Sequence, residues 1–299
     1  MKRAIGIDLG GTSIKGGLID EEGNILKKVK KDTVTARGKT QVLERISQVI
    51  DMLKDDNLIG IAIGSPGFID SDKGKVLKVG GNIKDWAGTK IKGELEKKHP
   101  NIPIFVENDA NVAAICEHWL GAAKEYDNFI MMTLGSGLGG AIYIENHGLI
   151  KGHRYRGGEL GHAIFIPEGK LCSCGQKGCV EQYISGNAVE NIYEKRAGFK
   201  KKGKDIFKSM NDDKIANEVV HEFSHNLGIY ISSLKNIFDP QGIVIGGGVI
   251  NSKAYWWDKM IESYMDYCND WEDMDIVPAE FLNNAGMIGA GKIVFNRLR

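Results

Sequence analysis

The chain of 299 residues is long enough for one large domain or two ordinary ones, with a core that needs no disulfide or metal. Apolar residues make up 42% of it and charged residues 26%, a balance typical of globular proteins. The net charge of zero argues against a nucleic-acid or anionic-membrane partner, since both require a basic surface.

The first residues do not resemble a targeting segment, because Asp8 interrupts a short apolar run. Nowhere does the sequence approach the roughly 18 consecutive apolar residues of a membrane span. We therefore expect a cytoplasmic protein whose five cysteines are reduced, which favours metal binding or simple burial over disulfides.

Strands and helices alternate along the chain, with Gly-rich turns between them, which predicts an α/β fold. The first part predicts strands over 3–10, 13–20, 25–31, 58–64 and 102–106, and helices over 40–53 and 110–123. The second part predicts strands over 128–135, 141–146 and 242–248, a loop-rich stretch over about 154–181, and helices over 217–238, 255–267 and 286–298.

An internal repeat aligns Asp8–Thr12 with Thr133–Gly137, and Gly23 with Gly148. Both copies consist of a strand, a Gly-rich turn, a strand, a turn and a strand. This repetition predicts two similar lobes around a central cleft, with the Gly-rich turns of both lobes facing it. We place the small N-terminal lobe at 1–115, joined by a C-terminal helix at 286–299, and the large lobe at 116–285.

The segment DLGGTSIK (8–15) is the first candidate phosphate loop. Gly10 and Gly11 allow the backbone to approach phosphate oxygens, Thr12 adds a hydroxyl donor and Lys15 adds a positive charge. Asp8, at the strand end, can hold Mg²⁺ through water. The alternative is an ordinary hairpin that contains glycine.

The segment TLGSGLGG (133–140) contains the pattern G-x-G-x-x-G at Gly135, Gly137 and Gly140. A dinucleotide-binding loop must be followed by a helix, but a strand is predicted here, which favours a hairpin that grips phosphate. A third Gly-rich segment, IGGGV (245–249), suits the packing of adenine or ribose on bare backbone, or equally a close contact between helix and strand.

The segment ENDAN (107–111) follows a predicted strand and precedes a helix. Asn108 and Asp109 offer the paired donors and acceptors that sugar hydroxyls need. Phosphoryl transfer to an alcohol also needs a carboxylate that accepts the hydroxyl proton, and Asp109 is the candidate. The alternative is that this segment caps the helix.

A cluster of three cysteines and one histidine is the most specific pattern in the sequence. It comprises His162, Cys172, Cys174 and Cys179. A Cys₃His set forms a closed tetrahedral zinc site without an open position, so the predicted zinc ion is structural. Glu159 and Glu181 flank this loop and suit sugar hydroxyls, although either can equally be a surface charge. Cys116 and Cys268 lie outside the cluster.

Together these segments resemble the ROK family of sugar kinases and repressors, within the actin/hexokinase-like ATPase fold. The resemblance covers nearly the whole chain. It rests on DLGGTSIK, SPG (65–67), ENDAN, TLGSGLGG, ELGH (159–162), CSCGQKGCVE (172–181) and IGGGV. Two positions depart from the family pattern: Ser136 stands where Thr is common, and GGNIKDW (80–86) differs around Asn82.

The resemblance implies a role for each motif. Asp109 is implied as the base that activates the sugar 6-hydroxyl, and His162 as a ligand of both sugar and zinc. The implied sugar-binding residues are Gly67, Asn82, Asn108, Asp109, Glu159, His162 and Glu181. The implied nucleotide-binding residues are Asp8, Gly10, Gly11, Thr12, Lys15, Gly135, Ser136, Gly137, Gly247 and Gly248. A homodimer is also implied.

The sequence therefore predicts a kinase that transfers the γ-phosphate of ATP to the 6-hydroxyl of a hexose, with glucose as the first choice. An N-acetylmannosamine or N-acetylglucosamine kinase is the alternative within this class. A sugar-responsive repressor is a remote alternative, since the first Gly-rich motif begins at residue 8 and a DNA-binding domain would precede it. An inactive sugar-binding module conflicts with the intact motifs.

Overall fold

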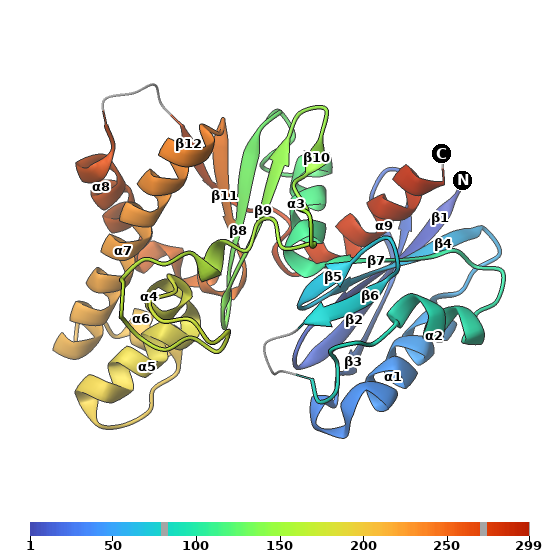
Figure 1. The fold of residues 1–299 in the computed structure, drawn as a ribbon, viewed down its shortest axis with the longest axis horizontal. Coiled ribbons are helices and arrows are strands. Elements are labelled where there is room, and N and C mark those ends of the chain that lie inside the picture. The colour runs from blue at the N-terminus through green and yellow to red at the C-terminus, as the bar shows by residue number, and fades with distance from the viewer. Residues whose placement is uncertain (79–82, 270–273, 299) are drawn as a thin grey trace. The chain divides into compact units, whose positions relative to one another are not determined.

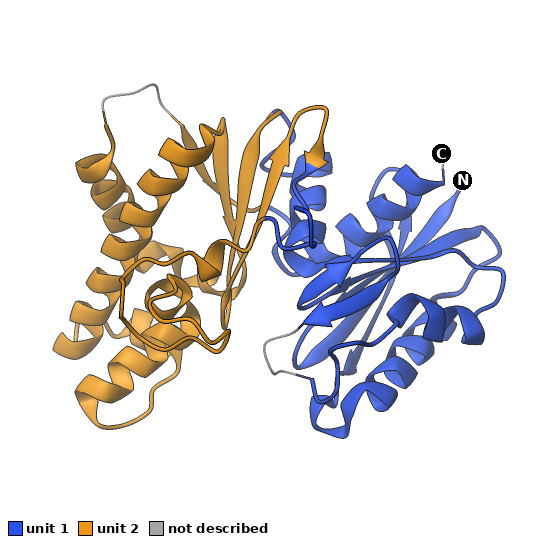
Figure 2. Ribbon diagram, viewed as in Figure 1, with its two compact units in different colours: residues 1–125, 149–157, 280–299 blue, residues 126–148, 158–279 orange. Residues whose placement is uncertain are grey.

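The computed structural model describes residues 1–78, 83–269 and 274–298. Asn82, which the sequence predicts to contact sugar, lies outside these residues. The chain divides into two compact units, which are coloured in Figure 2. Unit 1 comprises Met1–Glu125, Leu149–Gly157 and Glu280–Arg299, and unit 2 comprises Tyr126–Gly148 and Gly158–Ala279. Within the described ranges, none of the helices combines the length and apolar character that a bilayer crossing requires.

Unit 1 is built on a five-stranded sheet of order β3-β2-β1-β4-β7 (Figure 1). Its strands are β1 (Arg3–Leu9), β2 (Ser13–Asp20), β3 (Ile25–Asp32), β4 (Leu58–Ser65) and β7 (Ile104–Asn108). The first three form an antiparallel meander, whereas β1, β4 and β7 run parallel. A separate hairpin joins β5 (Phe68–Asp70) and β6 (Lys75–Lys78). The carboxyl ends of β1, β4 and β7 therefore meet at one edge.

Helices cover both faces of this sheet (Figure 1). On one face lie α1 (Gly38–Leu53) and α2 (Ile91–Lys98), and on the other α3 (Asp109–Leu120) and α9 (Ala285–Arg297). Because side chains alternate along a strand, Ile5, Ile7 and Leu9 of β1 join the core on the α1 side. The apolar face predicted for the helix over 40–53 is buried in α1, as expected.

Helix α9 packs so closely against β1 and α3 that one contact with each of them has no room for a side chain. A Cβ atom on Gly6 of β1 would lie 1.8 Å from the carbonyl oxygen of Met287. A Cβ atom on Gly289 of α9 would lie 1.9 Å from the carbonyl oxygen of Val112 in α3. These glycines bring the C-terminal helix against the two elements, β1 and α3, that carry Asp8 and Asp109.

Unit 2 repeats the arrangement in a second five-stranded sheet, of order β10-β9-β8-β11-β12. Its strands are β8 (Phe129–Leu134), β9 (Leu138–Ile144), β10 (Gly148–Leu149), β11 (Gly242–Gly246) and β12 (Asp275–Pro278). As in unit 1, an antiparallel hairpin (β8 and β9) is followed by parallel pairing, here of β8, β11 and β12. The two sheets of matching order confirm the two similar lobes that the internal repeat predicts.

The helices of unit 2 are α4 (Glu181–Ile184), α5 (Gly186–Ala197), α6 (Gly203–Lys208), α7 (Lys214–Phe238) and α8 (Trp257–Tyr267). Edge-to-face contacts link Phe207 of α6, Phe223 of α7 and Trp256, with ring centroids 5.5 Å apart in each pair. These buried rings hold the helical layer together, since aromatic pairs bury large apolar surfaces. Short 3₁₀ helices complete the fold: η1 (Thr35–Arg37), η2 (Leu160–His162), η3 (Gly248–Tyr255) and η4 (Leu282–Asn284).

Candidate active site and metal centre

In unit 1, the candidate residues gather where the parallel strands end. Asp8 of β1 pairs with Gly64 of β4, and Ser65 pairs with Asn108 of β7. Ligands of α/β proteins characteristically bind at the carboxyl ends of such strands. The sheet register therefore brings together Asp8, the turn that follows β1, and the Asn108–Asp109 pair.

Asn108 is the N-cap of α3, because its side-chain oxygen accepts hydrogen bonds from the backbone N–H groups of Ala110 (2.9 Å) and Asn111 (3.2 Å). Its amide nitrogen donates to the carbonyl of Gly67 at 3.1 Å. Gly67 has φ of 99°, a left-handed conformation that favours glycine. The capping alternative is thus correct for Asn108, and the cap fixes the start of the helix at Asp109.

Asp109 is the first residue of α3 and is exposed to solvent. Protein atoms nevertheless crowd the space around its carboxyl group. This desolvation, followed by the negative charge of Asp8, raises the pKa of Asp109 to about 6. A carboxylate with such a pKa is mostly ionised at neutral pH and is basic enough to accept a proton from an alcohol in a reaction.

The first Gly-rich turn connects β1 and β2, and hydrogen bonds to its backbone hold it in place. The N–H group of Gly10 donates to the carbonyl of Ser13 at 3.0 Å, and the hydroxyl of Thr33 donates to the carbonyl of Gly10 at 2.6 Å. A Cβ atom on Gly11 would meet nothing within 4 Å, so the tip of the turn faces open space. Lys15 lies on β2 with its ammonium 3.3 Å from the carboxylate of Asp8.

An ion pair with a buried carboxylate lies next to this edge, and no motif in the sequence predicts it. The carboxylate of Glu107 lies 2.7 Å from the ammonium of Lys151, and also accepts a hydrogen bond from the side chain of Asn111 at 3.0 Å. Lys151 belongs to the short segment 149–157 and also donates to the hydroxyl of Ser71 at 2.7 Å. Glu107 was visible within ENDAN, but no local pattern signals a partner so distant in sequence.

In unit 2, the turn between β8 and β9 contains Gly135, Ser136 and Gly137. The α4–α5 segment holds it: the N–H of Gly186 donates to the carbonyl of Gly135 at 2.8 Å, and that of Asn187 to the carbonyl of Ser136 at 3.3 Å. A strand follows the turn, as the sequence predicts for a hairpin rather than for a dinucleotide-binding loop.

The turn after β11 lies at the same edge of this sheet, because Gly246 pairs with Thr133 of β8. Gly247 has φ of 84°, and a Cβ atom there would lie 2.4 Å from the carbonyl oxygen of Leu134. Gly248 meets nothing within 4 Å. Glycine at 247 thus permits the close contact with the backbone of Leu134, whereas glycine at 248 leaves bare backbone exposed beside the second Gly-rich turn.

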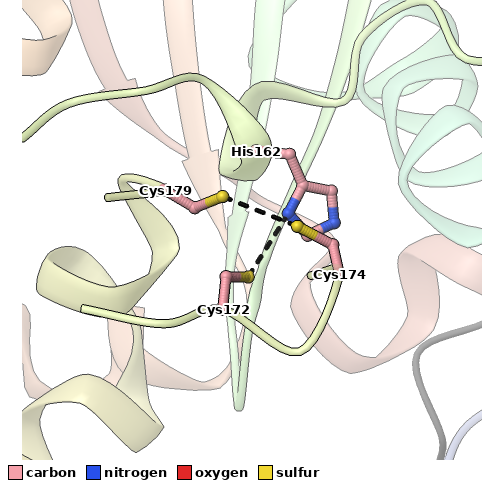
Figure 3. A group of neighbouring side chains, drawn as sticks. All are labelled: His162, Cys172, Cys174 and Cys179. Atoms are coloured by element: carbon pink, nitrogen blue, oxygen red, sulfur yellow. Dashed lines mark hydrogen bonds between the residues drawn. The ribbon is translucent and has the colours of Figure 1, made fainter. Parts of the chain in front are cut away.

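The predicted metal ligands converge in unit 2 (Figure 3). One donor atom from each of His162, Cys172, Cys174 and Cys179 lies within 4.8 Å of the others. The Sγ atom of Cys172 is 3.7 Å from Nδ1 of His162, and the Sγ atoms of Cys174 and Cys179 are 3.6 Å apart. Zn–S bonds of about 2.3 Å in a tetrahedron place sulfur atoms about 3.8 Å apart, so these residues fit a zinc ion.

The two glutamates that flank the cluster have different surroundings. Glu159 precedes the short helix η2, and its carbonyl accepts a hydrogen bond from the N–H of His162 at 3.1 Å. Glu181 begins α4, two residues after Cys179, and its carboxylate accepts a hydrogen bond from the N–H of Leu138 at 2.9 Å. The structure thus ties Glu181 to the second Gly-rich turn.

Comparisons with known proteins agree with this architecture. Residues 4–297 match the ROK family. The chain is 31% identical over 316 residues to the glucokinase of Thermotoga maritima, covering 99% of this chain and 98% of that protein. A ROK family glucokinase from Streptomyces griseus, solved in complex with glucose and AMPPNP, is 30% identical with a TM-score of 0.87, over 98% of this chain and 99% of that chain. A proposed N-acetylmannosamine kinase from Listeria monocytogenes is 26% identical with a TM-score of 0.87, over 99% and 100% of the two chains.

The two sheets have matching strand order, and each has a Gly-rich turn after its first strand. This architecture defines an α/β protein of the actin/hexokinase-like fold. The match of the family over almost the whole chain makes the assignment more specific. The chain belongs to the ROK family.

Proposed function

We propose that the protein is an ATP-dependent hexose kinase that phosphorylates the 6-hydroxyl of glucose. The observation that carries this proposal is Asp109, a carboxylate whose pKa is raised to about 6 at the strand edge where the family motifs gather. The similarity to the Thermotoga glucokinase over the full chain and to the Streptomyces structure with glucose and AMPPNP, an ATP analogue, supports it.

In the proposed reaction, Asp109 accepts the proton of the sugar hydroxyl while the hydroxyl oxygen attacks the γ-phosphorus of ATP; the bond from that phosphorus to the β-phosphate oxygen breaks, and ADP leaves. The cap formed by Asn108 fixes the first turn of α3 and so directs the Asp109 side chain. We assign sugar binding to Gly67, Asn82, Asn108, Asp109, Glu159, His162 and Glu181. Of these, His162 turns Nδ1 towards the cysteines, which leaves its other ring nitrogen for a sugar hydroxyl.

We assign the phosphates to the two Gly-rich turns and the adenosine to the turn after β11. Their residues are Gly10, Gly11, Thr12, Lys15, Gly135, Ser136, Gly137, Gly247 and Gly248. Backbone N–H groups in such turns stabilise the negative charge that spreads over the transferred phosphoryl group. Asp8, beside Asp109, is the residue that would hold Mg²⁺, which neutralises phosphate charge when bound.

We assign a structural zinc ion to His162, Cys172, Cys174 and Cys179. A Cys₃His set leaves no coordination position open for substrate, so the ion orders the loop and takes no part in the chemistry. Strand pairing in the loop between these ligands is limited to isolated bridges, Ile164 with Cys179 and Leu171 with Lys177, so the ion would add to its rigidity.

This proposal includes the predicted lobes, a small one at 1–115 with 286–299 and a large one at 116–285, and their closure around substrate. It also includes a homodimer and a cytoplasmic location. Closure would exclude water, which otherwise accepts the phosphoryl group.

The alternative substrate is an N-acetylhexosamine, which the similarity to the proposed N-acetylmannosamine kinase favours. A coupled assay of ADP release with glucose, mannose, N-acetylglucosamine and N-acetylmannosamine tests both. We expect the highest kcat/KM with glucose; a preference for an N-acetyl sugar would select the alternative. If no sugar in this panel causes ADP release, the result would contradict the kinase assignment and favour a repressor or an inactive sugar-binding module.

A further inference from the structure

The second Gly-rich turn, residues 135–137, is held by a charged side chain from the zinc-binding loop. The Oε2 atom of Glu181 accepts a hydrogen bond from the N–H group of Leu138 at 2.9 Å. The same oxygen would lie 2.3 Å from a Cβ atom on Gly137. Glycine at 137 therefore leaves the space that the carboxylate occupies, which explains this glycine independently of any contact with phosphate.

The zinc-binding loop also fixes the backbone of the residues on either side of Glu181. The N–H of Gln182 donates to the carbonyl of Cys179 at 3.0 Å, and the N–H of Val180 donates to the carbonyl of Ala163 at 2.9 Å. Cys179 and Val180 are completely buried. The other carboxylate oxygen of Glu181 lies 3.9 Å from the sulfur of Cys172. Glu181 thus spans the distance between the metal cluster and the turn.

We infer that Glu181 is a positioning residue for the nucleotide, in addition to its proposed contact with sugar. Its carboxylate holds the N–H of Leu138, and with it the adjacent turn, in the orientation that receives the phosphates of ATP. This inference rests on the proposed function. It makes the zinc-binding loop a structural link between sugar binding and nucleotide binding, because one carboxylate serves both.

Four proteins test the inference: the wild type, Glu181→Ala, Glu181→Gln and Glu168→Gln. The glutamine at 181 keeps an oxygen acceptor for the N–H of Leu138, whereas alanine removes it. Glu168 lies on the same loop, is exposed and pairs with Lys177 at 2.8 Å, so its variant controls for loss of loop charge. The affinity for AMPPNP with Mg²⁺ is measured by calorimetry without any sugar, so that loss of a sugar contact cannot affect the result.

We expect Glu181→Ala to weaken AMPPNP binding about tenfold, as the loss of a hydrogen bond to a charged group predicts. Glu181→Gln and Glu168→Gln should stay within about twofold of the wild type. Amide hydrogen exchange at Leu138, a readout that needs no ligand, should become faster in Glu181→Ala alone. Glucose affinity should fall in both variants at position 181.

Equal AMPPNP affinity in Glu181→Ala and the wild type, with unchanged exchange at Leu138, would overturn the inference and leave the proposed function intact. Wild-type protein that binds no AMPPNP would instead contradict the proposed function itself. Circular dichroism of each variant separates these results from unfolding. If the alanine variant does not fold, Glu181→Gln carries the test: a loss of AMPPNP affinity well beyond twofold, or faster exchange at Leu138, would overturn the inference, because glutamine keeps the acceptor for that N–H group.

Discussion

The ammonium group of Lys151 lies 2.7 Å from the carboxylate of Glu107, two residues before Asp109. Only 7% of the Glu107 side chain is exposed, so its charge depends on protein partners rather than on water. The N–H of Asn108 also donates to this carboxylate, at 3.0 Å. The segment 149–157 is thereby attached to the start of α3 through an ion pair in which Lys151 supplies the cation for a buried carboxylate.

The variant Lys151→Met should lower the free energy of unfolding by about 2 kcal/mol, because it leaves the Glu107 carboxylate without its cation. We also expect kcat to fall severalfold, since the displaced carboxylate supports the residues around Asp109. The matched control is Lys97→Met, whose ammonium is 2.9 Å from Glu94 in an ion pair with both side chains exposed. Urea denaturation should show almost no change for the control. Equal stability of both variants would contradict the role of the pair.

The activity should depend on pH through Asp109, which acts as a base only when its carboxyl is ionised. With a pKa of about 6, kcat/KM should rise through pH 6 and level off above pH 7. At pH 5 it should be about tenfold below the plateau. Initial rates at saturating ATP, with circular dichroism to confirm folding at each pH, provide the measurement. A flat profile between pH 5 and 8 would be inconsistent with Asp109 as the base.

The close packing of α9 on α3 can be tested with one added methyl group. In Gly289→Ala the Cβ atom would lie 1.9 Å from the carbonyl oxygen of Val112, and backbone cannot yield as a side chain can. We expect a loss of at least about 2 kcal/mol in the free energy of unfolding. Gly93→Ala is the control, because a Cβ atom in that helix meets nothing within 4 Å, and it should stabilise by up to about 1 kcal/mol. Similar thermal melts for both would refute the contact.

Protein purified without added metal should contain about one zinc ion per chain, measured by elemental analysis. Cys174→Ser should lose the ion, since it removes one of the four ligands. Cys268→Ser should retain it, because Cys268 lies at the end of α8 and its sulfur is hydrogen-bonded to Lys235 instead. A wild-type protein that holds no zinc while its cysteines are reduced would falsify the assignment.

Local sequence patterns predicted the two sheets and their main helices, because apolar periodicity and Gly-rich turns are local signals. The strand expected over 102–106 lies at Ile104–Asn108 in the structure. Pro103 has no N–H for the ladder, and pairing with β4 extends the strand to Asn108, opposite Ser65. Partner strands decide such boundaries, and a single segment of sequence does not reveal them.

The motifs of the site could be predicted from the sequence, but the hydrogen-bond and ion-pair partners that hold them in place could not. The Cys₃His spacing predicted a cluster that the structure assembles. The partners of Glu107 and Glu181 are, by contrast, Lys151 and the N–H of Leu138, which are distant in sequence. The helix that begins at Gly186 was also missed, although Ser185 caps it with a hydrogen bond from the N–H of Ala188 at 3.1 Å.

The most direct test of the proposed chemistry compares the wild type with Asp109→Asn. The amide cannot accept the hydroxyl proton, so kcat for glucose should fall by at least about a thousandfold, within the range that general bases contribute. Glucose affinity, measured by calorimetry, should remain within a few-fold, because the amide still fills the position and forms hydrogen bonds. Near-normal turnover in Asp109→Asn would contradict the assignment of Asp109 as the catalytic base.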